Sequence, residues 1–283
     1  MFIGDALDNF VLSLNSQTEL GLSKAEAVQE VNSIVQHVLE KNRAWLITHY
    51  KTELSETEFF KINILLNRRL TGEPVSYILG SREFYGLQLK TTPATLIPRS
   101  DTEALVEAAL EKIPQSGSLN ILDLGTGTGA VALAIASERP QAKLSAVDAS
   151  LEALKVATEN AQALKLNNVC LLKSNWFSAL QSQKFDVIVS NPPYIAQDDE
   201  HLKQGDLRFE PISALASGKD GLDDIRKIIQ DAPDYLKSNG WLMLEHGYDQ
   251  AEAVAALLKA RGFSQIAHAK DIAGTLRVTF GAI

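Results

Sequence analysis

The sequence predicts an α/β fold in which a mostly parallel sheet follows a small helical N-terminal region. Beyond residue 99, short apolar segments typical of buried strands alternate with segments of helical periodicity. Such alternation implies parallel strands covered by helices on both faces. The first 73 residues show only helical patterns. The length of 283 residues also exceeds that of a typical single core, so two unequal domains are expected.

Residues 1–73 are expected to form a helical bundle that acts as a substrate-recognition domain. Ser23 with Glu26, and Ser55 with Glu58, fit the capping box, in which each side chain covers a free backbone N–H of the first helical turn. Apolar residues at helical spacing follow each box. The region has seven basic and ten acidic side chains, which disfavours a nucleic-acid platform and favours a bundle that packs on or receives another molecule.

Residues 74–98 are rich in glycine and proline around two short apolar segments, which predicts a β-hairpin linker. Residues 99–283 then form the expected sheet domain. Its expected strands are Leu119–Leu124, Lys143–Asp148, Val169–Leu172, Phe185–Ser190, Trp241–Glu245, Phe263–Ala267 and Arg277–Phe280. Its expected helices are Ala130–Ser137, Leu151–Leu164, Leu222–Leu236 and Ala251–Ala260.

Composition indicates a cytoplasmic protein. The net charge of −8, from 27 basic and 35 acidic side chains, disfavours a broad nucleic-acid footprint and leaves only a local basic patch open. The single cysteine, Cys170, suits a reducing compartment and is expected to be a small buried residue within a strand. The N-terminus resembles no secretory signal, and no window has about 18 uninterrupted apolar residues. The five histidines show no metal-ligand spacing, so no metal site is expected.

A glycine-rich loop after the first strand of the sheet predicts a ligand site. Its residues are Gly125, Thr126, Gly127, Thr128 and Gly129. Glycines let the backbone turn sharply and approach a ligand closely. The spacing departs from the Gly-x-Gly-x-x-Gly of dinucleotide sites, and no Lys-Ser/Thr pair of an ATPase-type phosphate loop follows. A bare tight turn is the alternative.

Residues after the next two strands suggest an adenosine ligand. Asp148 lies about 20 residues beyond the loop, where a carboxylate can accept both ribose hydroxyls. Asn175 offers an acceptor for the adenine amine, and Trp176 can cover a ring face, although both also fit a polar turn. An adenosine without a pyrophosphate points to S-adenosyl-L-methionine, with S-adenosyl-L-homocysteine as product. Asp123 is placed to act on the cationic sulfonium or to orient the amino-acid part.

The strongest motif is the turn Asn191-Pro192-Pro193-Tyr194, directly after a strand. Consecutive prolines lack N–H donors and fix φ, so the carbonyls are rigidly aimed. The Asn191 side-chain oxygen and the Pro192 carbonyl are two acceptors for an incoming –NH₂ group, and Tyr194 supplies an aromatic face. We assign Asn191, Pro192 and Tyr194 as catalytic and the whole turn as substrate-binding, with Asn191 also next to the cofactor. A proline-stiffened loop without chemistry is the alternative.

This chemistry suits an amide substrate. The lone pair of an amide nitrogen is delocalised, so a site that holds both N–H bonds can align the nitrogen for in-line attack on a methyl carbon. Arg99 and Glu210 lie in loops between elements and are included as substrate-binding candidates. They either shape the substrate pocket or pair with neighbouring side chains.

These motifs together resemble the bacterial peptide chain release factor glutamine methyltransferases, the PrmC/HemK family, over essentially the whole chain. The supporting segments are Arg82–Tyr85, Leu96–Arg99, Asp101–Glu103, Arg208–Pro211 and Leu244–Gly247. The resemblance implies a Rossmann-like class I methyltransferase sheet. It also implies methyl transfer from S-adenosylmethionine to the glutamine amide of the Gly-Gly-Gln motif in class-1 release factors, in support of translation termination.

The resemblance assigns the glycine loop, Asp148 and Trp176 to the cofactor, and the Asn-Pro-Pro-Tyr turn to the glutamine. Two positions depart from the family pattern. Ser81 stands where the family often has glycine, and Asn175 where it often has aspartate. The second change replaces a carboxylate by a neutral amide, which lessens the expected adenine recognition. The expected partners are class-1 release factors, with no stable nucleic-acid or membrane binding, and the chain is expected to be a monomer.

Three other functions are alternatives. A methyltransferase acting on an exocyclic amine of a nucleic-acid base uses a similar turn, but it normally needs a phosphate-binding surface that an acidic chain lacks. A nucleotide-dependent oxidoreductase is disfavoured by the glycine spacing and by the Asn-Pro-Pro-Tyr turn. A non-catalytic adaptor is disfavoured because every catalytic position is intact.

Overall fold

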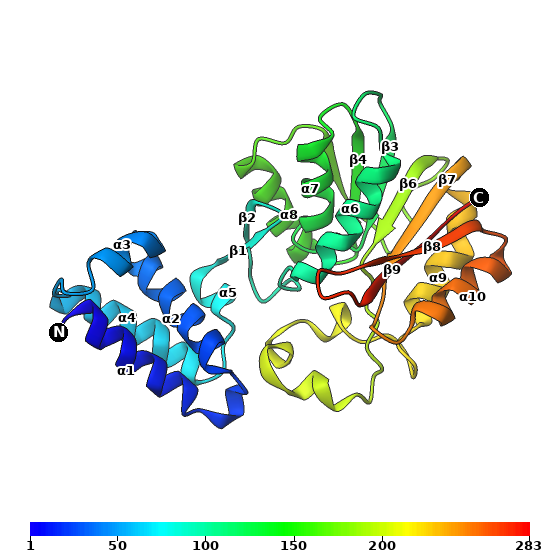
Figure 1. The fold of residues 1–283 in the computed structure, drawn as a ribbon. Helices are drawn as coiled ribbons and strands as arrows, with labels where there is room; N and C mark the ends of the chain where they lie inside the picture. The colour runs from blue at the N-terminus through cyan, green and yellow to red at the C-terminus, as the bar shows by residue number, and fades with distance from the viewer. The chain divides into compact units, whose positions relative to one another are not determined.

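The computed structural model describes residues 1–283, apart from the side chain of Glu19. The chain divides into two compact units (Figure 1). The helical unit comprises Met1–Gly80 together with Lys203–Phe209, and the sheet unit comprises Ser81–Leu202 and Glu210–Ile283. The division into domains 1–73, 74–98 and 99–283, with their separate roles, stays a prediction.

The helical unit is built from amphipathic helices around one apolar core. They are α1 Ile3–Asn15, α2 Lys24–Leu39, α3 Arg43–Thr48, α4 Glu56–Leu70 and α5 Val75–Leu79. Both predicted capping boxes are confirmed. The backbone N–H of Ser55 donates to Glu58 Oε2 at 2.8 Å, and that of Glu58 donates to Ser55 Oγ at 3.2 Å. Ser23 and Glu26 make the same pair of bonds at the start of α2.

A buried arginine ties the segment Lys203–Phe209 into this unit. Arg69 is only 2% exposed, and its Nε donates to Glu30 Oε2 at 2.7 Å. Its Nη1 lies 3.3 Å from Asp206 Oδ1. Burial raises the pKa of Glu30 in spite of the arginine. Because a buried guanidinium without its partners is costly, this pairing fixes the segment against α2 and α4.

The predicted hairpin is present as β1 Ser81–Phe84 and β2 Leu87–Lys90, paired antiparallel. Its two turn residues, Tyr85 and Gly86, both have positive φ, as a tight hairpin turn requires. The residues just before it form helix α5, which the linker prediction did not include. Pro74 and Gly80 are the caps of that helix, so the proline and glycine signals marked helix ends as well as turns.

The sheet unit contains a seven-stranded sheet with strand order β5-β4-β3-β6-β7-β9-β8. The strands are β3 Asn120–Leu124, β4 Lys143–Asp148, β5 Val169–Lys173, β6 Phe185–Ser190, β7 Leu236–Glu245, β8 Ser264–Lys270 and β9 Leu276–Ala282. Strands β3 to β7 are parallel, whereas β9 is antiparallel to both of its neighbours, β7 and β8. The predicted mostly parallel sheet is confirmed.

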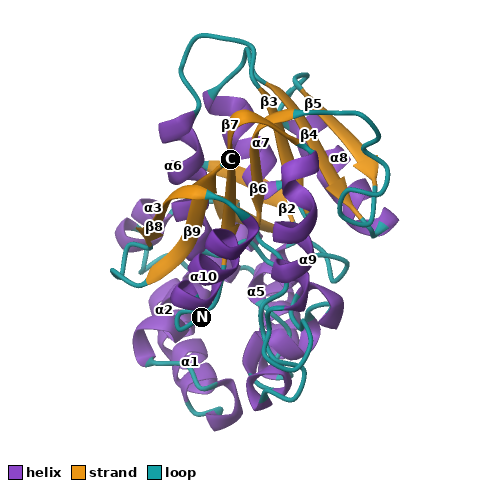
Figure 2. Ribbon diagram, turned by 90° about the vertical axis from the view of Figure 1, so that its right-hand side faces the viewer, coloured by secondary structure: helices purple, strands orange, loops and turns teal.

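Helices cover both faces of the sheet, as the parallel strands require (Figures 1 and 2). On one face lie α6 Glu103–Lys112, α7 Ala130–Glu138 and α8 Leu151–Ala163, and on the other α9 Asp223–Asp231 and α10 Ala251–Arg261. Successive residues of a strand point to opposite faces. Accordingly, Ile121 packs with the α6–α7 core and Leu122 with the α9–α10 core.

Two expectations at the level of elements are wrong, and one helix was missed. Helix α9 ends at Asp231 and not at Leu236, because Pro233 lies in the 3₁₀ turn Ala232–Asp234 that follows. Helix α6 was not predicted. Cys170 is exposed and not buried, because β5 is an edge strand of the sheet. In the described part of the chain, no helix combines the length and apolar character needed to cross a membrane.

Candidate active site

A cavity of about 340 Å³ opens at the carboxyl ends of the central parallel strands. Most of the predicted site residues line it: Arg99, Gly125, Thr126, Gly127, Thr128, Asp148, Asn175, Trp176, Asn191 and Pro193. Gly129, Pro192, Tyr194 and Glu210 are not among the lining residues. The edge at which parallel strands end is where open α/β sheets bind ligands, and the volume is within the range of small-molecule sites.

The glycine loop connects β3 to α7 and forms one wall of the cavity. Gly125 has φ +72°, and a Cβ there would lie 3.3 Å from the Trp176 ring, so a side chain would crowd the indole. Gly129 has φ +85° and is the N-cap of α7, where a Cβ would lie 2.9 Å from Leu133 Cδ1. Gly129 packs against the helix that it caps, and its expected contact with a cofactor stays a prediction.

Asp148, at the end of β4, is fixed by two backbone donors. Its Oδ2 accepts from the N–H of Gly127 at 2.9 Å, and its Oδ1 accepts from the N–H of Ser150 at 2.8 Å. A carboxylate has about four acceptor positions, so each oxygen keeps capacity for a further donor. The Asp148 carboxylate is therefore held by the glycine loop and remains able to accept two ligand hydroxyls.

Asp123, also on the cavity wall, is almost completely buried. The Thr126 hydroxyl donates to its Oδ2 at 2.6 Å. Burial raises the pKa of Asp123 to about 7 against the effect of this hydrogen bond, and the charge of Asp148 raises it further. With Asp224, three carboxyl groups line the cavity. The one basic side chain among the described lining residues is Arg99, so the charge favours a cationic ligand.

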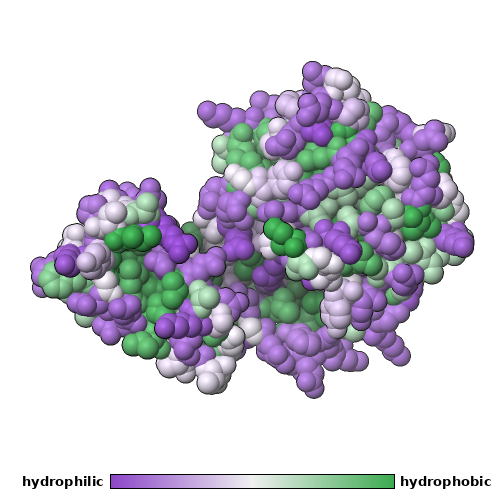
Figure 3. Space-filling view, in the orientation of Figure 1, coloured by the Kyte–Doolittle hydropathy of each residue, from purple (hydrophilic) through white to green (hydrophobic). Residues whose placement is uncertain are grey.

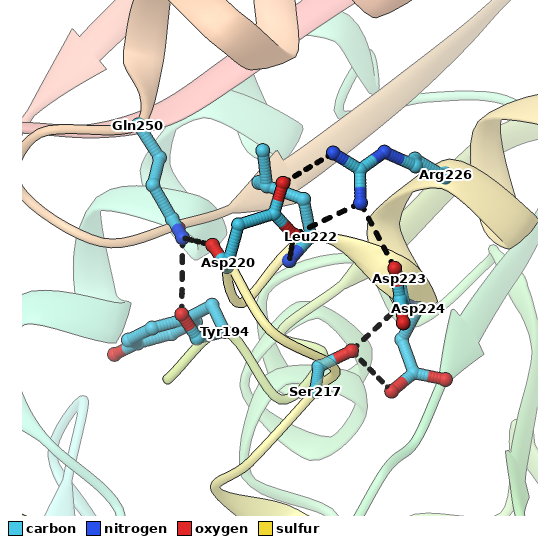
Figure 4. Close-up of polar contacts among 8 residues, drawn as sticks. All are labelled: Tyr194, Ser217, Asp220, Leu222, Asp223, Asp224, Arg226 and Gln250. Atoms are coloured by element: carbon cyan, nitrogen blue, oxygen red, sulfur yellow. Dashed lines mark hydrogen bonds and ion pairs between the residues drawn. The ribbon is translucent and has the colours of Figure 1, made fainter. Parts of the chain in front are cut away.

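Trp176 is held by an aspartate that the sequence did not reveal. Its indole Nε1 donates to Asp224 Oδ1 at 3.2 Å, and Ser217 Oγ donates to Asp224 Oδ2 at 2.7 Å (Figure 4). Trp176 also has positive φ, 50°, a strained conformation for a large residue. Asn175, beside it, is exposed and lines the cavity. The indole is thus fixed in position, whereas the exposed side chain of Asn175 is available to a ligand in the cavity.

The Asn-Pro-Pro-Tyr turn follows β6 on the same side of the sheet. Asn191 Nδ2 donates to Thr102 Oγ1 at 3.2 Å, which turns the amide oxygen away from Thr102. Pro193 lines the cavity and Pro192 is buried. The Tyr194 hydroxyl donates to Glu245 Oε1 at 3.2 Å, and burial raises the pKa of Tyr194. Tyr194 therefore anchors the turn to β7. The role suggested by the sequence, an aromatic face against the reacting group, stays a prediction.

The segment 215–224 and Gln250, the N-cap of α10, hold the turn in place (Figure 4). Gln250 Nε2 donates to the carbonyl of Tyr194 at 3.0 Å and to that of Asp220 at 3.2 Å, and its Oε1 accepts from the N–H of Gly247 at 2.8 Å. Gly221 is so close to the turn that a Cβ would lie 2.1 Å from the Tyr194 oxygen. Gly221 was the sequence signal of this close packing.

Arg99 and Glu210 form an ion pair at the cavity. The Glu210 side chain is buried, and its Oε2 accepts from the N–H of Ile97 at 3.0 Å. The sequence left open whether these residues shape the substrate pocket or pair with neighbouring side chains. The geometry favours pairing for Glu210, and this ion pair positions Arg99 on the cavity wall. Among the described residues, no group of three His, Cys, Asp or Glu side chains is arranged to hold a metal.

The chain is similar to known methyltransferases. The methyltransferase small domain family matches residues 101–207, and the PrmC N-terminal domain family matches residues 16–80. A release factor glutamine methyltransferase of Xylella fastidiosa (strain Temecula1 / ATCC 700964) is 48% identical over 89% of this chain and 92% of its own length. That of Escherichia coli (strain K12) is 45% identical over 89% and 91%. A methyltransferase crystal structure from Pyrococcus furiosus, 21% identical, covers 79% of this chain and 97% of its own with a TM-score of 0.54, and shares the fold.

Proposed function

This chain belongs to the release factor glutamine methyltransferase family, and we propose that it methylates the side-chain amide nitrogen of the glutamine in the Gly-Gly-Gln motif of class-1 release factors. The methyl donor is S-adenosyl-L-methionine, and S-adenosyl-L-homocysteine is the product. The observation that carries the proposal is that Asn191 and Pro193 share one cavity with the glycine loop and Asp148. An acceptor for an amide therefore lies in the same cavity as a site for an adenosine.

The residues present fit this cofactor. Asp148 keeps acceptor capacity for two ribose hydroxyls beyond its bonds to Gly127 and Ser150. The Trp176 ring lies against Gly125 and is fixed by Asp224. The carboxyl groups of Asp123, Asp148 and Asp224 outnumber the basic side chains of the described wall, which suits a sulfonium cation. When bound, the cofactor supplies an electrophilic methyl group.

The chain's own residues then act by orientation. Asn191 presents its side-chain oxygen as an acceptor because its –NH₂ group is occupied by Thr102. We assign the Pro192 carbonyl as a second acceptor, so that the two N–H bonds of the substrate amide are both held. Holding both bonds fixes the direction of the nitrogen lone pair, and most of the acceleration then comes from alignment and from preorganised dipoles. No strong base is required beside the nitrogen before transfer.

We assign recognition of the release factor to the helical unit. Hydrophobic groups gather on the face of this unit that Figure 3 shows. Phe60 and Ile64, one turn apart on α4, are 66% and 45% exposed. Exposed aromatic and aliphatic side chains on a folded unit are typical of protein interfaces. We further propose a cytoplasmic monomer without stable nucleic-acid binding, in line with the net charge of −8.

The test is mass spectrometry of a purified class-1 release factor after incubation with the chain and S-adenosylmethionine. We expect one added methyl group on the glutamine of the Gly-Gly-Gln peptide. A release factor with that glutamine replaced by alanine is the matched control and should stay unmodified. Parallel incubation of total nucleic acid with isotopically labelled cofactor tests the alternative of a base methyltransferase. Label in nucleic acid and none in the release factor would overturn the proposal.

A further inference from the structure

Behind the Asn-Pro-Pro-Tyr turn lies a buried acidic group that the proposed reaction does not use directly. Glu245, at the end of β7, is 1% exposed. Its Oε1 accepts from the Tyr194 hydroxyl at 3.2 Å. Its Oε2 has no hydrogen-bond partner within normal distance among the described residues. A buried carboxyl oxygen without a partner is rare enough in folded proteins to require an explanation.

Thr102 lies between this carboxyl group and Asn191. It closes the 3₁₀ turn Ser100–Thr102, is almost fully buried, and accepts from Asn191 Nδ2 at 3.2 Å. The same hydroxyl lowers the pKa of Glu245 against the effect of burial. A hydroxyl that accepts a hydrogen bond still has a proton to donate, and the Glu245 carboxylate can accept it.

The direction of the hydrogen bonds from Asn191 through Thr102 to Glu245 is set by the carboxyl group of Glu245. An ionised carboxylate can only accept, so the Thr102 proton points to Glu245 and the Thr102 lone pairs face Asn191. Asn191 must then turn its –NH₂ group to Thr102, and its oxygen is left for the cavity. With the opposite orientation of this amide, the cavity would offer a donor, which suits a carboxylate side chain better than a carboxamide.

We infer that Thr102 and Glu245 are positioning residues that fix the orientation of the Asn191 carboxamide and so make the site select glutamine over glutamate. This inference rests on the proposed function of the turn. Neither residue needs to touch the substrate. Thr102 and Glu245 determine whether Asn191 presents its oxygen or its –NH₂ group to the substrate.

The surroundings of Glu245 make its charge state sensitive to pH. It faces Tyr194 from the turn, Thr102 and Asp101 from the 3₁₀ turn and Arg277 from β9. Burial raises its pKa to about 7. Below that pH the protonated acid can donate, and the fixed direction of the bonds is lost. Methyl transfer should therefore increase as the pH rises through about 7, and this dependence should be weaker in Glu245→Gln, which keeps only the contribution of the cavity carboxyl Asp123, whose pKa is also about 7.

The decisive comparison uses two substitutions at one position. Thr102→Val removes the hydroxyl with little change of shape, and Thr102→Ser keeps it. The measurements are kcat and KM for a class-1 release factor, and the inhibition constant of the same factor with its glutamine replaced by glutamate. We expect Thr102→Ser to stay close to the parent, and Thr102→Val to lose about tenfold in kcat/KM, the effect of one hydrogen bond. The valine variant should also bind the glutamate factor relatively more tightly.

The outcomes separate the inference from the proposed function. Equal turnover and equal glutamine preference in the parent and in Thr102→Val would overturn the inference and leave the proposed function standing. No transfer by the parent would overturn both. Thermal stabilisation by S-adenosylhomocysteine confirms that each variant is folded. If Glu245→Gln fails to fold, the two Thr102 variants, which retain the carboxylate, still decide the question.

Discussion

At the scale of single residues, Asn191 is the side chain whose loss should separate binding from chemistry. Asn191→Ala removes one acceptor for the substrate amide and leaves Asp148 and the glycine loop unchanged. We expect cofactor binding within a few-fold of the parent and a loss of about a hundredfold or more in kcat, in the range seen when one preorganised polar group is removed. Calorimetry with S-adenosylhomocysteine and single-turnover kinetics measure the two effects. Comparable turnover by variant and parent would contradict the assigned role.

Asp123 should make stability depend on pH in an unusual direction. Burial raises its pKa from 3.8 to about 7, so between these values the folded state holds a proton that the unfolded state has lost. The contribution of Asp123 to the free energy of unfolding therefore decreases as the pH rises from about 4 to about 7. Urea titrations across this range should show the decrease in the parent and a flatter profile in Asp123→Asn.

Asp220→Asn is the control for that experiment. Hydrogen bonds from Arg226 lower the pKa of Asp220 to about 2, so its contribution to stability is lost only as the pH falls below about 4. The slope between pH 4 and pH 7 should equal that of the parent. An identical slope for Asp123→Asn would show that Asp123 is ionised in the folded protein throughout the range.

The sequence predicted the residues of the site that stand next to a strand end. Asp148 ends β4, Asn191 follows β6 directly and Trp176 lies shortly after β5, and the parallel order brings these strand ends together. The residues that hold them could not be predicted. Asp224 and Gln250 come from segments distant in sequence, and only the folded chain brings them to the indole and to the turn.

At the scale of elements, the packing of Gly221 against the Asn-Pro-Pro-Tyr turn can be tested by adding one methyl group. In Gly221→Ala the new Cβ would lie 2.1 Å from the carbonyl oxygen of Tyr194 at φ +76°. Backbone must move, so we expect the turn to shift and kcat to fall at least tenfold. Kinetics with a release factor and thermal unfolding measure activity and stability in the same preparation.

Gly262→Ala is the matched control, because it has φ +99° and open space where the Cβ would lie. Its strain alone should cost about 1 kcal/mol of stability and leave kcat unchanged. Equal kcat in the two alanine variants would show that the 215–224 segment does not hold the turn.

The sequence also predicted elements unequally well. Strands β4 and β6 begin and end at the predicted residues, because neither is an edge strand and each carries buried apolar residues between clear turn signals. Helix α5 and the early start of β7 were missed, since short elements bounded by glycine or proline resemble turns. Exposure of Cys170 depends on strand order, which local sequence does not encode.

At the scale of the whole molecule, the two units should contribute separately to substrate binding and to catalysis. Phe60→Ala removes a side chain that is 66% exposed on the helical unit. We expect KM for the release factor to rise about tenfold, as for an aromatic contact worth more than 1 kcal/mol, with kcat and cofactor affinity unchanged. Ile272→Ala, on a fully exposed residue of the sheet unit, is the control and should change neither. An unchanged KM in Phe60→Ala would remove Phe60 from the interface.

The position of β9 constrains the order in which the sheet is assembled during synthesis. Strand β8 precedes β9 in the chain, yet its pairing partner is β9, which in turn pairs with β7. While the nascent chain emerges from the ribosome, β8 therefore cannot join the sheet until β9 has been synthesised. The parallel strands can form a folding nucleus earlier. The turn at Asp271 and Gly274, with Thr275 N–H donating to Asp271 Oδ1 at 2.9 Å, then closes the hairpin that docks last.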